Sequence, residues 1–71
     1  MFMSKIELKM RERIIKKIED AGADSKKKAV SVATAEFDLQ EQYWLPYLVG
    51  TFNKYKIEKT EDNKYYHQNI N

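Results

Sequence analysis

The sequence predicts a mostly α-helical domain that ends in a β-hairpin. Apolar residues recur at helical spacing in three segments, which we assign as helices at residues 4–21, 26–36 and 39–55. Residues 56–68 instead alternate with a period of two around an acidic turn, which is typical of a hairpin. A chain of 71 residues has the length of one domain, so residues 1–71 are expected to share one small core.

Composition limits the class of protein. Hydrophobic residues make up 42% of the chain and charged residues 34%, which fits a globular domain rather than a disordered one. The chain has no cysteine and one histidine, which excludes disulfides, thiolate nucleophiles and histidine-rich metal clusters. No apolar run approaches the roughly 20 residues that span a bilayer. The start, MFMSKIELK, lacks a secretory hydrophobic region, so we expect a cytoplasmic protein with no membrane partner.

The first predicted helix, residues 4–21, has the strongest pattern. Ser4 and Glu7 have capping-box spacing, and Gly22 can end the helix with a positive φ. Its apolar stripe consists of Ile6, Met10, Ile14, Ile15, Ile18 and Ala21. Charged residues occupy the other side, which is expected to face water.

The second predicted helix, residues 26–36, begins after Asp24 or Ser25, either of which can cap it. Its apolar stripe consists of Val30, Ala33 and Phe37. The run Ala-Val-Ser-Val-Ala-Thr also alternates like a strand, so this segment has two readings. Its first turn would hold Lys26, Lys27 and Lys28. The helix dipole disfavours cations there, so these lysines either bind a phosphate or point into water from an exposed loop.

The third predicted helix, residues 39–55, starts with Asp38 and Glu41 at capping-box spacing and follows the second helix almost without a linker. Pro46 removes one helical hydrogen bond, so we expect a kink or a division there. Gly50 costs about 1 kcal/mol relative to alanine, which suggests close approach of another backbone or tight packing. The core face would carry Leu45, Leu48, Val49 and Phe52, and the outer face Tyr43, Tyr47, Gly50 and Lys54.

The hairpin at residues 56–68 is predicted from Lys56-Ile57-Glu58-Lys59-Thr60 and the aromatic run that follows Glu61-Asp62-Asn63. Aspartate and asparagine tolerate the left-handed backbone angles that such turns need. A C-terminal helix capped by Thr60 is the alternative.

Three helices, the second and third tightly joined, followed by a hairpin, resemble a winged helix-turn-helix domain over roughly residues 5–68. The resemblance implies a third helix in the major groove of DNA and a hairpin wing on the backbone or in the minor groove. It implies DNA-facing residues Gln40, Tyr43, Tyr47, Thr51 and Lys54 from the helix, and Lys59 and Lys64 from the wing. Pro46 and the two tyrosines depart from the usual polar recognition helix.

The expected function is therefore binding of double-stranded DNA, in the role of a transcriptional regulator. Lysines would neutralise phosphates, Gln40 could read an adenine edge, and tyrosine hydroxyls could bond phosphates. The net charge is only +2, so DNA binding would require the positive charges to be grouped on one surface. We expect a homodimer, because a small domain without disulfides gains from association. The alternative is a protein-interaction module that uses an aromatic patch of Tyr43, Trp44 and Tyr47.

We expect no enzymatic activity, cofactor, metal or small-molecule substrate. The sequence has no phosphate-binding glycine loop and no metal-ligand spacing. His67 has no cysteine nucleophile to activate, and the serines lie in helix starts or helices. The chain begins with Met1, and we expect an intact small protein rather than a fragment of an enzyme.

Overall fold

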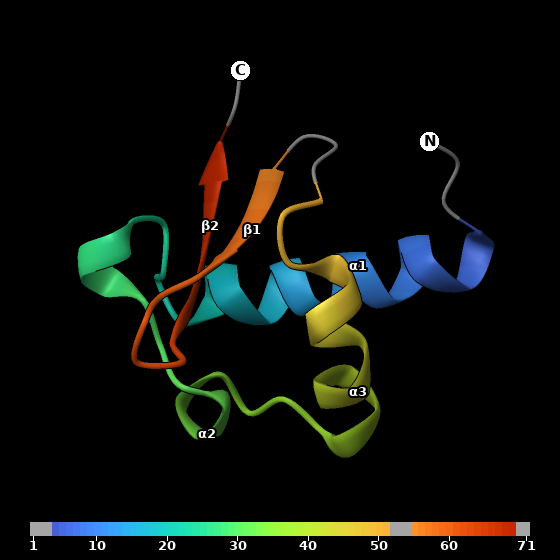
Figure 1. The fold of residues 1–71 in the computed structure, drawn as a ribbon, viewed down its shortest axis with the longest axis horizontal. Helices are drawn as coiled ribbons and strands as arrows, with labels where there is room; N and C mark the ends of the chain where they lie inside the picture. The colour runs from blue at the N-terminus through green and yellow to red at the C-terminus, as the bar shows by residue number, and fades with distance from the viewer. Residues whose placement is uncertain (1–3, 52–54, 70–71) are drawn as a thin grey trace.

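A computed structural model describes residues 4–51 and 55–69 of the chain. In chain order these residues form the helix α1 (Lys5–Asp20), the 3-10 helix η1 (Lys26–Lys28), the helices α2 (Val32–Ala35) and α3 (Leu39–Leu48), and the strands β1 (Tyr55–Lys59) and β2 (Tyr65–Asn69). Figure 1 shows α1 crossing the middle of the molecule, with η1 at one side and α3 toward the other. Three α-helices and a C-terminal antiparallel hairpin confirm the predicted fold class and fit a helix-plus-wing arrangement.

The first helix agrees with its prediction. The Ser4 hydroxyl accepts a hydrogen bond from the Glu7 N–H at 3.2 Å, and Gly22 ends the helix region with a φ of 74°. Most of the predicted stripe is buried, but Ile6, in the first turn, is 64% exposed. The core therefore begins about one turn into the helix, at Met10.

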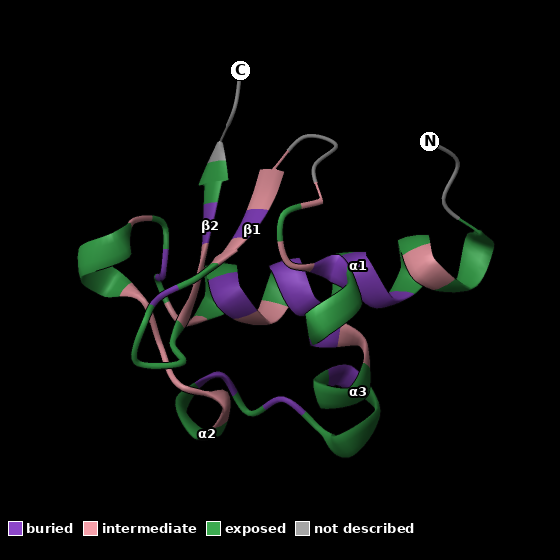
Figure 2. Ribbon diagram, in the orientation of Figure 1, coloured by how far each residue is buried: buried purple, intermediate pink, exposed green. Residues whose placement is uncertain are grey.

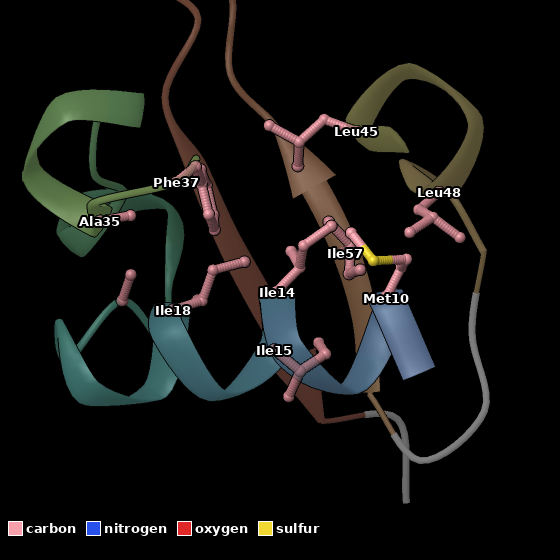
Figure 3. Close-up of a cluster of buried hydrophobic side chains, with 10 residues drawn as sticks. Met10, Ile14, Ile15, Ile18, Ala35, Phe37, Leu45, Leu48 and Ile57 are labelled. Atoms are coloured by element: carbon pink, nitrogen blue, oxygen red, sulfur yellow. The ribbon is translucent and has the colours of Figure 1, made fainter. Parts of the chain in front are cut away.

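The core lies where α1 meets the hairpin, α3 and the segment around Phe37. Figure 3 shows side chains of α1 reaching toward Ile57 of β1 and toward the two leucines of α3. The most deeply buried large apolar residues are Ile14, Ile18, Leu45, Leu48 and Ile57. Burial of each such side chain stabilises the fold by roughly 1.5–3 kcal/mol, so these few residues dominate the stability of a chain this short.

The prediction of one helix over residues 26–36 is wrong. After η1, Val30 pairs with Tyr65 of β2 through N–H···O bonds of 2.9 and 2.7 Å in the two directions. The short helix α2 starts only afterwards, where the Ser31 hydroxyl accepts from the Thr34 N–H at 3.1 Å. The strand-like alternation around Val30 prevails because β2 offers backbone partners that satisfy its N–H and C=O groups.

The third helix ends earlier than predicted, at Leu48 rather than near Tyr55. It runs through the exposed Pro46 as one element, so it is not divided there. Gly50 lies beyond the helix with a φ of 86°, and a Cβ there would meet nothing within 4 Å. Glycine is therefore suited to this position by its left-handed backbone rather than by close approach of another backbone. The predicted helical residues 52–54 lie outside the described residues.

The hairpin is confirmed, which excludes the alternative of a C-terminal helix. Its strands pair in an antiparallel register that sets Tyr55 opposite Asn69 and Lys59 opposite Tyr65. Asn63 takes the left-handed conformation in the turn, with a φ of 61°. The Thr60 hydroxyl accepts from the Lys64 N–H at 3.1 Å, so Thr60 closes the turn instead of capping a helix.

The start of α3 is fixed to α1 by charged side chains. The predicted capping box is present: the Asp38 carboxylate accepts from the Glu41 N–H, and the Glu41 carboxylate accepts from the Asp38 N–H. Glu41 is fully buried, and its carboxylate also pairs with Lys17 and, at 3.3 Å, with Arg13 of α1. This junction holds the start of α3 against α1.

Candidate nucleic-acid interface

Strand register brings lysines from two distant parts of the chain to one end of the hairpin. Tyr65 pairs with Lys59 on one side and forms the bridge with Val30 on the other. Lys64 directly precedes Tyr65, and Lys28 lies two residues before Val30. The pairing at Tyr65 therefore places η1 and the wing side by side.

An open hollow of about 340 Å³ lies between η1 and the wing. Its lining residues are Lys26, Lys27, Ala29, Thr60, Glu61, Asp62 and Lys64. We call the five exposed lysines of this region the lysine end: Lys26, Lys27, Lys28, Lys59 and Lys64. Figure 2 shows η1 and the turn of the hairpin as exposed, so this end of the molecule is open to a large partner.

The lysine end keeps part of its charge unpaired. Lys28 lies 3.6 Å from Asp24, and Lys64 lies 3.6 Å from Asp62. Such exposed pairs contribute about 0–1 kcal/mol, so they can exchange for another anion. Among residues 4–51 and 55–69, the other three lysines form no ion pair. A hydrogen bond from the Thr60 hydroxyl, above all, lowers the pKa of Asp62, so that carboxylate stays charged at neutral pH.

The outer side of α3 forms a second exposed surface. We call it the aromatic face: Leu39, Gln40, Tyr43, Pro46 and Tyr47. Leu39 is 83% exposed, and the two tyrosines are 64% exposed. The rings of Tyr43 and Tyr47 lie with centroids 5.7 Å apart, and both contact Trp44, which is half-buried against the core. The predicted patch of Tyr43, Trp44 and Tyr47 is thus one continuous cluster.

The aromatic face carries no formal charge. The one charged residue within α3 is Glu41, which is fully buried and paired with side chains of α1. Figure 1 places α3 and η1 on opposite sides of the molecule. Most of the described residues predicted to face DNA therefore fall on two separate surfaces, one charged and one aromatic.

Of the predicted site residues that the structure describes, one joins neither surface. Thr51 is half-buried, and its hydroxyl donates to the Leu48 carbonyl, so it terminates α3. Lys54 lies outside the described residues.

The burial of three polar side chains was not predictable from the sequence. Capping-box spacing predicts Glu41 as a cap, but nothing in the sequence links it to Lys17 and Arg13. Arg11 is only 5% exposed and lies beside the apolar stripe of α1, where burial lowers the pKa of its guanidinium. His67 is buried against the ring of Tyr55, with centroids 4.7 Å apart. The available signal was helical or strand periodicity, which places Arg11 three residues before Ile14 and His67 within a strand.

Comparison of the chain with protein-family models, curated proteins and solved structures gave no match. Within the described part of the chain, no three His, Cys, Asp or Glu residues are grouped so that they could hold a metal ion. None of the helices formed by residues 4–51 and 55–69 has the length and apolar character to cross a membrane.

Proposed function

We propose that the protein binds duplex DNA through the lysine end. The observation that carries this proposal is an open hollow lined by Lys26 and Lys27 of η1 and Lys64 of the wing, with Lys28 and Lys59 completing the five lysines of this end. Three carboxylates lie among them: Asp24, Glu61 and Asp62. A chain with a net charge of only +2 thus concentrates an excess of positive charge at one end.

Lysine ammonium groups suit the phosphates of the DNA backbone. They are point charges on flexible stems, so they neutralise phosphates without a fixed geometry. Each phosphate contact releases condensed counterions, which supplies a favourable, salt-dependent free energy of binding. Such contacts position a protein on DNA but do not read its sequence. The proposed contact is therefore with the backbone, and regulation of transcription is the setting that the winged-helix resemblance suggests.

A salt titration of binding to random duplex DNA tests the proposal. Fluorescence anisotropy with a labelled duplex should show log K falling against log salt with a slope of about −3 to −5, since three to five lysines release roughly 0.9 counterion each. The triple variant Lys26→Gln, Lys27→Gln, Lys59→Gln should lower the steepness of this slope by about 3. It should weaken binding most at low salt.

The matched control removes the same charge from another surface. Lys5, Lys9 and Lys16 are exposed on α1, so their triple replacement by glutamine changes net charge equally. This control should keep most of the slope of the unaltered protein. Absence of binding at low salt, or an equal loss in both triple variants, would refute a DNA contact at the lysine end.

A protein-interaction module is the second candidate, and the aromatic face supports it. Tyrosine and tryptophan are common anchors of protein interfaces, and the outer side of α3 exposes an apolar, uncharged surface. Trp44 is the only tryptophan, so its fluorescence reports contact at this face. A change in Trp44 emission on protein association, without any on addition of DNA, would favour this candidate.

A further inference from the structure

We propose that the aromatic face is where a second copy of this chain docks, with α3 packed against α3 about a two-fold axis. Leu39, Tyr43 and Tyr47 follow one another at intervals of four residues, so they form a ridge along the helix. Ridges of this spacing pack into the grooves of a second helix. Tyr43 is the middle residue of the ridge and lies nearest the proposed axis.

The chemistry of the aromatic face is complementary to itself. A two-fold axis places a patch against its own copy, so a charged residue near the axis would meet a like charge. The aromatic face has no charged residue. Its polar groups are the Tyr43 and Tyr47 hydroxyls and the Gln40 amide, and each of these can both donate and accept a hydrogen bond. Each can therefore pair with whichever of these groups the second copy sets opposite it, which favours a second copy over a partner selected by charge.

The area of the face fits a weak dimer. A fully buried tyrosine covers about 150–250 Å², so two tyrosines at two-thirds exposure, with Leu39, present on the order of 300–400 Å². A two-fold interface uses this patch twice and buries roughly 600–800 Å², which lies in the class of weak interfaces below about 1,200 Å². The dimer should therefore form and dissociate with concentration.

The two tyrosines of the ridge are already packed within the single chain. The rings of Tyr43 and Tyr47 contact each other and the half-buried Trp44, which packs on the core. The first turn of α3 is held by its capping box and by the buried Glu41. Docking thus immobilises few side chains that were free, which lowers its entropic cost.

This inference does not rest on DNA binding. The lysine end lies on the opposite side of the molecule from α3 and would remain exposed in the dimer. A dimer would carry two lysine ends.

Sedimentation over a concentration series tests the dimer. The apparent mass should rise from 8.5 kDa toward twice that value as concentration increases. Leu39→Glu should weaken association at least tenfold, because it buries an unpaired carboxylate against the apolar ridge of the second copy. An acidic residue is favourable in a first helical turn, so this variant keeps its fold. The matched control is Ile6→Glu, which replaces an exposed apolar residue in the first turn of α1 and should leave the mass unchanged.

A charge-exchange experiment tests the geometry. Tyr43→Lys and Tyr43→Glu should each be monomeric alone, and an equal mixture should form a dimer, because opposite charges then meet near the axis. The proposal is overturned if the unaltered protein stays monomeric up to about 1 mM, a concentration at which a Kd of about 1 mM would already give a substantial dimer fraction. It is also overturned if Ile6→Glu weakens association as much as Leu39→Glu, or if the mixture stays monomeric. It is overturned as well if the chain does not self-associate and a different protein binds its aromatic face.

Discussion

Two groups of basic side chains in this molecule have opposite environments. Arg13 and Lys17, on α1, point at the buried carboxylate of Glu41 and join α1 to α3. At the lysine end, Lys26, Lys27 and Lys64 line an open hollow, and the neighbouring carboxylates are exposed. The residue types are similar, but the burial of the opposing carboxylate differs completely.

This difference separates a structural role from a binding role. A fully buried carboxylate must be paired, because an isolated charge away from water is costly. Arg13 and Lys17 therefore have a structural role, because they pair with the buried carboxylate of Glu41. An exposed ammonium group loses little when its partner changes, so the lysine end can offer its charge to another molecule. Substitutions in the two regions should thus affect different measurements.

The largest expected loss of stability follows from Glu41→Gln at the junction of α1 and α3. The side chain keeps its shape but loses the charge that Lys17 and Arg13 face, and breaking a buried pair costs up to about 3–5 kcal/mol. Both partners reach water in part, so we expect a loss of about 2–3 kcal/mol in the free energy of unfolding. That corresponds to a fall in Tm of roughly 10–20 °C, measured by circular dichroism.

The control is the same substitution at the lysine end, Glu61→Gln, where the carboxylate is exposed. It should change the free energy of unfolding by less than about 0.5 kcal/mol. Equal losses of unfolding free energy in Glu41→Gln and Glu61→Gln would mean that burial of the carboxylate does not decide its contribution to stability.

A smaller effect is expected for the matched pair Lys17→Met and Lys27→Met. Lys17 donates to the Glu36 carbonyl at 2.8 Å and pairs with Glu41, so its loss should cost about 1–2 kcal/mol. Lys27 is exposed, and its loss should stay within about 0.5 kcal/mol. Urea unfolding of both variants measures the two values. A larger loss of stability in Lys27→Met than in Lys17→Met would contradict a structural role for Lys17 and a binding role for Lys27.

Local sequence signals predicted the elements that depend on local interactions. The caps at Ser4 and Asp38 place a side-chain oxygen beside an N–H a few residues away, so spacing alone reveals them. The hairpin likewise follows from alternation and a turn containing Asn63. The outer face of α3, with Tyr43 and Tyr47, followed from helical periodicity.

Features that depend on distant parts of the chain were not predictable. The bridge from Val30 to Tyr65 splits the second predicted helix, and it requires a strand that lies 35 positions further along. The partners of Glu41 come from α1, more than 20 residues earlier. Charge alone suggested a role for Lys26 to Lys28, but their proximity to Lys64 depends on the same bridge.

The smallest expected effect is on stability at acid pH. It involves Asp38, which lies at the junction of α1 and α3. A hydrogen bond from the Glu41 N–H, and then the positive charges of Arg13 and Lys17, hold the pKa of Asp38 below its usual value. The folded state thus binds fewer protons than the unfolded state. The stability that this carboxylate contributes is present above the unfolded pKa of about 3.9 and is lost as pH falls through the lower folded pKa.

Asp38→Asn keeps an acceptor for the cap but removes the titrating charge. Its Tm should therefore run nearly parallel to that of the unaltered protein from pH 7 to about pH 5, and fall less steeply below about pH 4. Asp62→Asn, in the turn beside Lys64, should flatten the acid limb in the same direction, because the Thr60 hydroxyl lowers the pKa of Asp62. Thermal unfolding by circular dichroism at a series of pH values measures both. Acid limbs of equal steepness in Asp38→Asn and the unaltered protein would show that the charge of Asp38 does not support the junction.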